Sequence, residues 1–224
     1  MDLSPLFISI KTALFATAFA FVMGILAAYF VLKRQRFKSL ADAVFTLPMV
    51  LPPTVVGFFL LLAFGKNSWI GQLLETMNLS VIFSWGGTVI ASTVVAFPLM
   101  YRTALGAFEQ VDENLFAAAR TLGISETAIF MKILLPNSLP GIVAGTILSF
   151  ARAMGEFGAT IMVAGNIPGR TQTMALAVYS ATQSGNRELA FKWVLVIVAL
   201  SFTAILSVNA WNSWLSRKKA GNLQ

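Results

Sequence analysis

Two ionisable side chains that could act on a solute, Arg152 and Glu156, lie four positions apart within an apolar stretch. That spacing places both on one face of a helix. Ionisable groups inside a membrane segment are unfavourable, and they are expected to face the protein interior or a water-filled path. The pair can be a structural ion pair whose charges neutralise each other, which we favour. Alternatively, Arg152 lends positive potential to an anion path and Glu156 orients it.

The residue types needed for most other site chemistry are missing. The chain has no histidine and no cysteine, which excludes disulfides and argues against zinc, haem and iron–sulfur ligation. The same absence removes Ser–His–Asp and Cys–His catalysis. No G-x-x-x-x-G-K-[ST] run is present to cradle ATP phosphates. We therefore expect no catalytic site, no metal site and no cofactor in this chain.

The composition indicates an integral membrane protein. Of 224 residues, 57% are hydrophobic and 11% are charged, whereas soluble domains have about 25% charged residues. The net charge of +7 could suggest a nucleic-acid partner, but the basic residues lie beside the hydrophobic stretches. The positive-inside rule explains that placement, and we expect no nucleic acid to bind.

Five stretches have the length of about 20 mostly apolar residues that a membrane-spanning helix needs: roughly 8–32, 43–64, 86–105, 141–165 and 191–215. A basic cluster at 33–38 follows the first and is expected in the cytoplasm, with the N-terminus outside. The first apolar run is too long for a signal peptide. A short helix at 68–77 is expected on the outer surface. We predict one all-α membrane domain over 1–224, with a cytoplasmic loop at 106–140.

The start of the second stretch is rich in proline. Pro48, Pro52 and Pro53, followed by Thr54, remove backbone donors and are predicted to prevent a regular helix. Irregular backbone at membrane depth is tolerated when it is buried in protein or lines a watery cavity. The stretch is therefore either a helix that starts late, after a re-entrant turn, or a broken segment that borders a transport path or its gate.

The loop between the third and fourth stretches is predicted to contain two helices separated by a stop. Gly123 has the backbone freedom of a C-terminal cap, Ser125 can cap the next helix, and Glu126 suits its first turn. Pro136 and Pro140 are expected to end that helix before the fourth span begins. In the fourth span, small residues at four-residue intervals predict close helix packing: Gly141, Gly145, Ser149 and Ala153.

This loop resembles the EAA motif of ABC-importer permease subunits. The pattern A-A-x-x-x-G, nine residues, then I-x-L-P is matched by Ala118, Ala119, Gly123, Ile133, Leu135 and Pro136. Ala117 stands where the motif has glutamate. The resemblance implies that the helical hairpin seats in a groove of an ATPase subunit. The residues implied in this contact are Ala118, Ala119, Arg120, Leu122, Gly123, Ile124, Ser125 and Glu126.

Three further stretches resemble the molybdate/tungstate importers within this family. They read LPMVLPPTVVG at 47–57, FARAMGEFGAT at 150–160 and GNIPGRTQT at 165–173. Sulfate/thiosulfate permeases share part of these themes and remain the alternative. The resemblance implies the type I ABC importer permease fold and a prokaryotic inner-membrane location. It also implies a second copy of the chain, two ATPase subunits that hold ATP and Mg²⁺, and an external oxyanion-binding protein. The residues implied in the pathway or gate are Pro48, Pro52, Pro53, Thr54, Arg152, Glu156 and Thr160.

Two other classes of protein compete with this interpretation. A stand-alone channel or secondary carrier usually has inverted repeats and more ionisable residues near the middle of the membrane, and neither feature is evident here. A membrane-embedded enzyme would need histidine, cysteine or clustered carboxylates, which the chain lacks.

Overall fold

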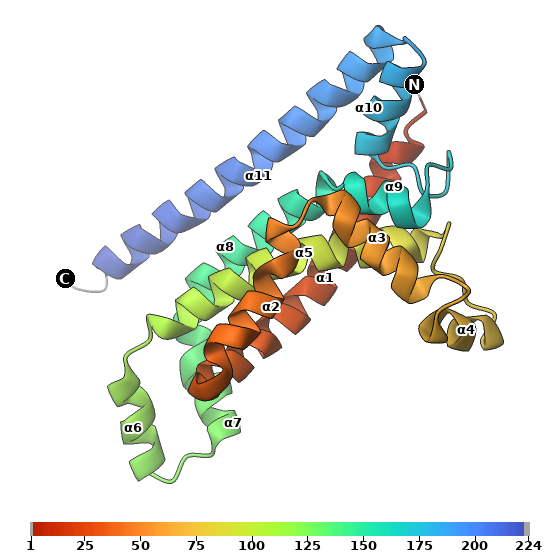
Figure 1. Ribbon diagram of the computed structural model, residues 1–224. Coiled ribbons are helices and arrows are strands. Elements are labelled where there is room, and N and C mark those ends of the chain that lie inside the picture. The colour runs from red at the N-terminus through yellow and green to blue at the C-terminus, as the bar shows by residue number, and fades with distance from the viewer. Residues whose placement is uncertain (1, 222–224) are drawn as a thin grey trace.

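In the part that a computed structural model describes, residues 2–221, all regular secondary structure is helical (Figure 1). Four helices, or runs of helices, in this part are long and apolar enough to cross a membrane, and one bent helix pair is a fifth candidate. The all-α prediction is confirmed. In chain order the elements are α1 (Ser4–Lys33), a 3-10 turn (Gln35–Phe37), α2 (Lys38–Val50), α3 (Pro53–Phe64), α4 (Trp69–Thr76), α5 (Trp85–Glu109), α6 (Glu113–Thr121), α7 (Glu126–Ile129), a π turn (Phe130–Leu134), α8 (Leu135–Met154), α9 (Gly158–Ala164), α10 (Met174–Gln183) and α11 (Arg187–Gly221).

The core is formed by α1, α5 and α8, which pack against one another. One face of α1 is lined by fully buried small side chains, which let α5 approach closely: Ala13, Ala16, Ala20 and Ala28. A Cβ added at Gly24 would lie 2.8 Å from Cγ of Met100 on α5. The small residues predicted to pack in the fourth span also contact α5, since a Cβ at Gly145 would collide with Thr103. These close contacts make the three helices one rigid unit.

The proline-rich stretch forms two helices, α2 and α3, bent by 109° relative to each other. The bend lies at Leu51 and Pro52, whose ψ angles are 144° and 135°. Each of them precedes a proline, and the proline ring pushes the preceding residue out of the helical region. The prediction was wrong for Pro48, which lies inside α2. Leu47, the residue before it, stays helical, so Pro48 removes one backbone donor from α2 without ending the helix.

No residue of α2 is fully buried, and polar contacts hold it against α5. Both carboxylate oxygens of Asp42 accept hydrogen bonds from Nη1 of Arg102 at 2.8 Å. The Tyr101 hydroxyl donates to the same carboxylate at 3.0 Å, and Lys38 Nζ lies 2.6 Å from Glu109 Oε1. The base of α2 is therefore fastened to α5 by charged groups, and further along α2 the Phe45 ring packs on Phe97 and Tyr101 of α5.

The expectation that Pro136 and Pro140 end the hairpin's second helix was wrong. The chain is helical without a break from Glu126 to Met154, through α7, the π turn and α8. Pro136 has no backbone donor. In the π turn just before it, Leu135 N–H donates to Phe130 O, and this wider hydrogen-bonding pattern lets the helix continue through the proline. The fourth span therefore starts earlier than 141 and ends at Met154. Gly155 caps it, and α9 is a separate helix.

The helix ends gather at two opposite poles of the bundle (Figure 1). The hairpin of α6 and α7 lies at one pole, and the N-terminus, α4, α9 and α10 lie at the other. The predicted outer helix at 68–77 corresponds to α4. Consecutive membrane-spanning helices thus alternate in direction between the two poles, as the predicted topology requires. Which pole faces the cytoplasm remains a prediction from the charge distribution.

Candidate functional site

The turn between α6 and α7 has the local geometry that the sequence predicts. Gly123 has a φ of +72°, a conformation that glycine adopts without steric cost. Ile124 N–H donates to Ala119 O at 3.1 Å and Gly123 N–H to Arg120 O at 3.0 Å. These two bonds are the Schellman motif. The Ser125 hydroxyl then accepts from Ala128 N–H at 3.4 Å and begins α7.

The tip of this hairpin exposes apolar side chains. Leu122 is 79% exposed and Ile124 38%. Ala118 is exposed as well, whereas Ala119 faces inward. Isolated exposed leucines are common, but here an apolar tip stands away from the bundle at the end of a two-helix projection (Figure 1). The tip has the character of a surface that a partner covers.

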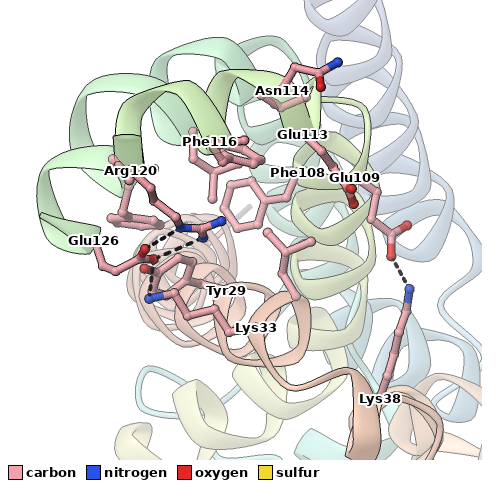
Figure 2. A pocket seen from close by; sticks show the side chains of 16 residues that line it. Tyr29, Lys33, Lys38, Phe108, Glu109, Glu113, Asn114, Phe116, Arg120 and Glu126 are labelled. Carbon is pink, nitrogen blue, oxygen red and sulfur yellow. Dashed lines mark hydrogen bonds and ion pairs between the residues drawn. The ribbon is translucent and has the colours of Figure 1, made fainter. Parts of the chain in front are cut away.

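Glu126 is the centre of a three-charge cluster beside the turn of the hairpin (Figure 2). Its carboxylate accepts from Arg120 Nε at 2.7 Å and lies 3.0 Å from Lys33 Nζ at the end of α1. This hydrogen bond raises the pKa of the Arg120 guanidinium above its already high usual value. The carboxylate thus joins α6, α7 and α1. The sequence had marked Arg120 and Glu126 but not Lys33, whose position suggested only a topological role.

A cleft of about 840 Å³ separates α6 from the ends of α1 and α5. Four aromatic side chains line it: Phe130 and the three labelled in Figure 2, Tyr29, Phe108 and Phe116. The Tyr29 and Phe130 rings are 4.5 Å apart, and the Phe108 and Phe130 rings are 6.3 Å apart. Because the cleft undercuts α6, the hairpin meets the bundle mainly through α7 and the π turn.

The second candidate site lies at the far end of α8. Glu156 is 1% exposed, and its Oε2 lies 2.9 Å from Arg152 Nη1, whose side chain is 33% exposed. The pairing is as predicted, but the placement on one helix was wrong, because α8 ends at Met154. Glu156 Oε1 instead accepts from the backbone N–H of Ala159 at 2.7 Å in the first turn of α9. Both carboxylate oxygens are engaged, which favours the structural interpretation of the pair.

This corner packs directly on the proline break. A Cβ at Gly158 would lie 2.9 Å from Pro53 Cβ and 3.2 Å from Thr54 N. A Cβ at Gly57 would lie 2.9 Å from Ala159 Cα. The structure thus brings Pro53, Thr54 and Glu156 into one region, although they come from distant stretches.

The other predicted gate residues differ in their surroundings. Thr160 on α9 is fully buried, and its hydroxyl has no hydrogen-bond partner among residues 2–221. Pro52 lies at the break itself, as the N-cap of α3. Pro48 is on α2, on the other side of the break. The gate set therefore divides between a packed α3–α9 corner and the separate arm α2.

Comparison with known proteins places this geometry in context. The family described as "Binding-protein-dependent transport system inner membrane component" matches residues 20–221. The molybdenum transport system permease protein ModB of Escherichia coli (strain K12) is 42% identical over 218 residues, covering 96% of this chain and 94% of ModB. The sulfate transport system permease protein CysT of the same strain is 34% identical over 217 residues, covering 96% and 78%.

Solved structures show the same fold. A chain of the MetNI methionine ABC transporter in an inward-facing conformation aligns with a TM-score of 0.67 at 16% identity, covering 92% of this chain and 94% of that one. At this identity the likeness concerns the fold alone. It confirms the fold that the sequence predicted.

Proposed function

We propose a function for this chain, which belongs to the family of binding-protein-dependent transport system inner membrane components: it is the permease subunit of an ATP-driven importer of molybdate, or of the chemically similar tungstate. The observation that carries this proposal is the 42% identity to ModB along almost the whole of both chains. The protein is a multi-pass component of the inner membrane.

Molybdate is favoured over sulfate by the difference in similarity. The sulfate permease CysT is 34% identical and is matched over 78% of its length. Both substrates are doubly charged tetrahedral oxyanions, so the physical chemistry of this chain does not separate them. We infer that an external binding protein makes most of the selection, and that this chain needs no tight anion site.

The hairpin is proposed as the contact with an ATPase subunit. Its apolar tip is exposed, with Leu122 79% accessible, and its turn is held in one geometry by the two Schellman bonds. A rigid, apolar projection suits insertion into a groove of another protein. The residues proposed for this contact run from Ala118 to Glu126. ATP and Mg²⁺ belong to the ATPase, and this chain itself carries no catalytic group.

The pathway is proposed to form between two copies of the chain. The core helices α1, α5 and α8 pack closely through small residues, so a single copy offers no wide polar passage through its centre. The bent pair α2 and α3 exposes apolar side chains such as Val50 and Phe59, and these can meet lipid or the second copy. Two copies would engage two ATPase subunits.

Transport is proposed to proceed by alternating access. Closure of the ATPase pair moves the hairpin, and the unbroken helix from Glu126 to Met154 carries that movement to the α8–α9 corner. There Glu156 and Arg152 hold the corner against the start of α3, next to the proline break. Displacement of this corner opens the outer side to the anion that the binding protein delivers, and hydrolysis returns the pathway to the inward state.

Uptake by proteoliposomes tests the proposal. The chain is reconstituted with its ATPase and binding protein, and labelled molybdate and sulfate are supplied separately with internal ATP. We expect ATP-dependent uptake of labelled molybdate, and we expect unlabelled sulfate to inhibit this uptake only weakly. Preferential uptake of sulfate would show that sulfate, and not molybdate, is the substrate. Uptake that continues without the ATPase would favour a secondary carrier instead.

A further inference from the structure

We propose that Lys33 is a positioning residue for coupling, which ties the ATPase-facing hairpin to α1 through Glu126. This inference rests on the proposed function and deepens it. It assigns to one residue of the basic cluster a role that membrane topology does not explain.

The geometry singles out Lys33 among its neighbours. Its ammonium lies 3.0 Å from Glu126 Oε2 and 4.7 Å from the centre of the Tyr29 ring. Tyr29 in turn packs on Phe130, the first residue of the π turn. Figure 2 shows Lys33, Tyr29 and Arg120 converging on Glu126 beside the turn of the hairpin. The end of α1 therefore meets the hairpin through an ionic and an aromatic contact at once.

The other cations of the cluster lack this contact. Arg36 lies in the 3-10 turn and has no ion-pair partner within residues 2–221. Lys38 is paired, but with Glu109 at the end of α5 rather than with the hairpin. Arg34 Cζ lies 5.8 Å from the centre of the Phe30 ring. All four basic residues of the cluster satisfy the positive-inside rule equally. A purely topological role gives no reason for one of them to meet the carboxylate that also binds Arg120.

The weakness of the Lys33–Glu126 ion pair fits a contact that transmits movement better than one that stabilises the fold. Lys33 and Glu126 side chains are 39% and 45% exposed, and half-exposed ion pairs contribute little to stability. The fold therefore does not depend on this pair. What the pair does is fix where the hairpin stands relative to α1, because the cleft beneath α6 leaves few other contacts between them.

Movement of Lys33 has a rigid route to the opposite pole. The small-residue face of α1 packs along α5. Near the other end of α1, the Ser9 hydroxyl accepts from Met174 N–H of α10 at 2.8 Å, and Thr12 contacts Thr88 on α5 at 3.2 Å. The hairpin would thus act on the outer pole through α1 as well as through α8.

The test compares Lys33→Gln with Arg34→Gln and Arg36→Gln in the complete reconstituted complex. The three variants remove the same charge from the same basic cluster. We measure anions imported per ATP hydrolysed, and the unfolding temperature in detergent. For Lys33→Gln we expect about a fivefold lower ratio, the lower end of typical coupling between sites, with unchanged unfolding temperature. The two control variants should keep the wild-type ratio.

A charge exchange separates pairing from topology. Lys33→Glu alone should lower the ratio further, because two carboxylates then face each other. Lys33→Glu with Glu126→Lys and Arg120→Gln restores a Lys–Glu pair without a cation facing Arg120, and it should recover part of the ratio. Equal effects of Lys33→Gln and Arg36→Gln, or no recovery in the exchange variant, would overturn the proposal.

Cross-linking tests the contact without transport. The chain has no native cysteine, so Lys33→Cys with Glu126→Cys can be linked by a short thiol reagent, with Arg36→Cys and Glu126→Cys as the comparison. Preferential linking of the first pair supports the contact, and equal linking contradicts it. If the wild-type complex shows no ATP-driven uptake, the proposed function fails, and the cross-link still reports on the contact.

Discussion

Glu126 and Arg152 lie near the two ends of one uninterrupted helical run, which extends from α7 through the π turn to the end of α8. At a rise of 1.5 Å per residue, roughly 40 Å separates them along the axis. Glu126 belongs to the proposed ATPase contact, and Arg152 holds the corner that packs on the proline break. One helix therefore connects the two regions that the sequence had marked separately. The following predictions test its two ends.

Leu122→Ser should weaken association with the ATPase and leave the fold intact. The side chain is 79% exposed, and surface substitutions of this kind usually change stability by less than about 0.5 kcal/mol. Co-purification with the ATPase subunit measures the association. Leu79→Ser is the matched control, since Leu79 is 55% exposed in the loop after α4, at the other pole. If both variants co-purify the same amount of ATPase, Leu122 is not part of the contact.

Gly123→Ala should strain the hairpin turn. The residue has a φ of +72°, and the left-handed conformation costs a non-glycine residue about 1 kcal/mol. We expect weaker coupling of uptake to ATP hydrolysis, because the tip no longer has a single geometry. Gly106→Ala is the control: it lies within α5, and no neighbouring atom is within 4 Å of its added Cβ. Gly106→Ala should be neutral or slightly stabilising; if both variants behave alike, the turn geometry is not what matters.

Glu156→Gln should destabilise the α8–α9 corner. The substitution removes the charge that Arg152 pairs with at 2.9 Å and weakens the bond from Ala159 N–H. Hydrogen bonds to charged groups contribute about 2 kcal/mol, so we expect a clearly lower unfolding temperature in detergent. Glu113→Gln, at an exposed carboxylate in α6, is the control and should have no effect. An unchanged unfolding temperature in Glu156→Gln would argue for a role in the anion path instead.

Gly57→Ala should separate α3 from α9. The added Cβ would lie 2.7 Å from Met162 Cβ and 2.9 Å from Ala159 Cα, and overpacking of this kind typically costs about 1–3 kcal/mol. Gly155→Ala is the control, because its nearest neighbour would be 3.8 Å away. We expect lower thermal stability and reduced uptake for Gly57→Ala alone. Wild-type uptake in that variant would mean that close contact of these helices is not needed for gating.

Features that depend on a few neighbouring residues follow from the amino-acid order alone. Low charge and long apolar runs indicate the membrane, and the family motif indicates the permease. The caps at Gly123 and Ser125 and the extended backbone at Leu51 and Pro52 result from interactions within one helical turn. Such interactions involve residues that are adjacent in the chain, so the sequence is sufficient to predict them.

The meeting of distant residues, in contrast, depends on how whole helices pack. Nothing in local spacing pairs Lys33 with Glu126, or Gly57 with Ala159. The same limit explains the error at Pro136, because its effect depends on the π turn before it and on the packing of α8 against α5. Glu156 was expected on a helix face for the same reason, and the end of α8 at Met154 gave it a different backbone partner.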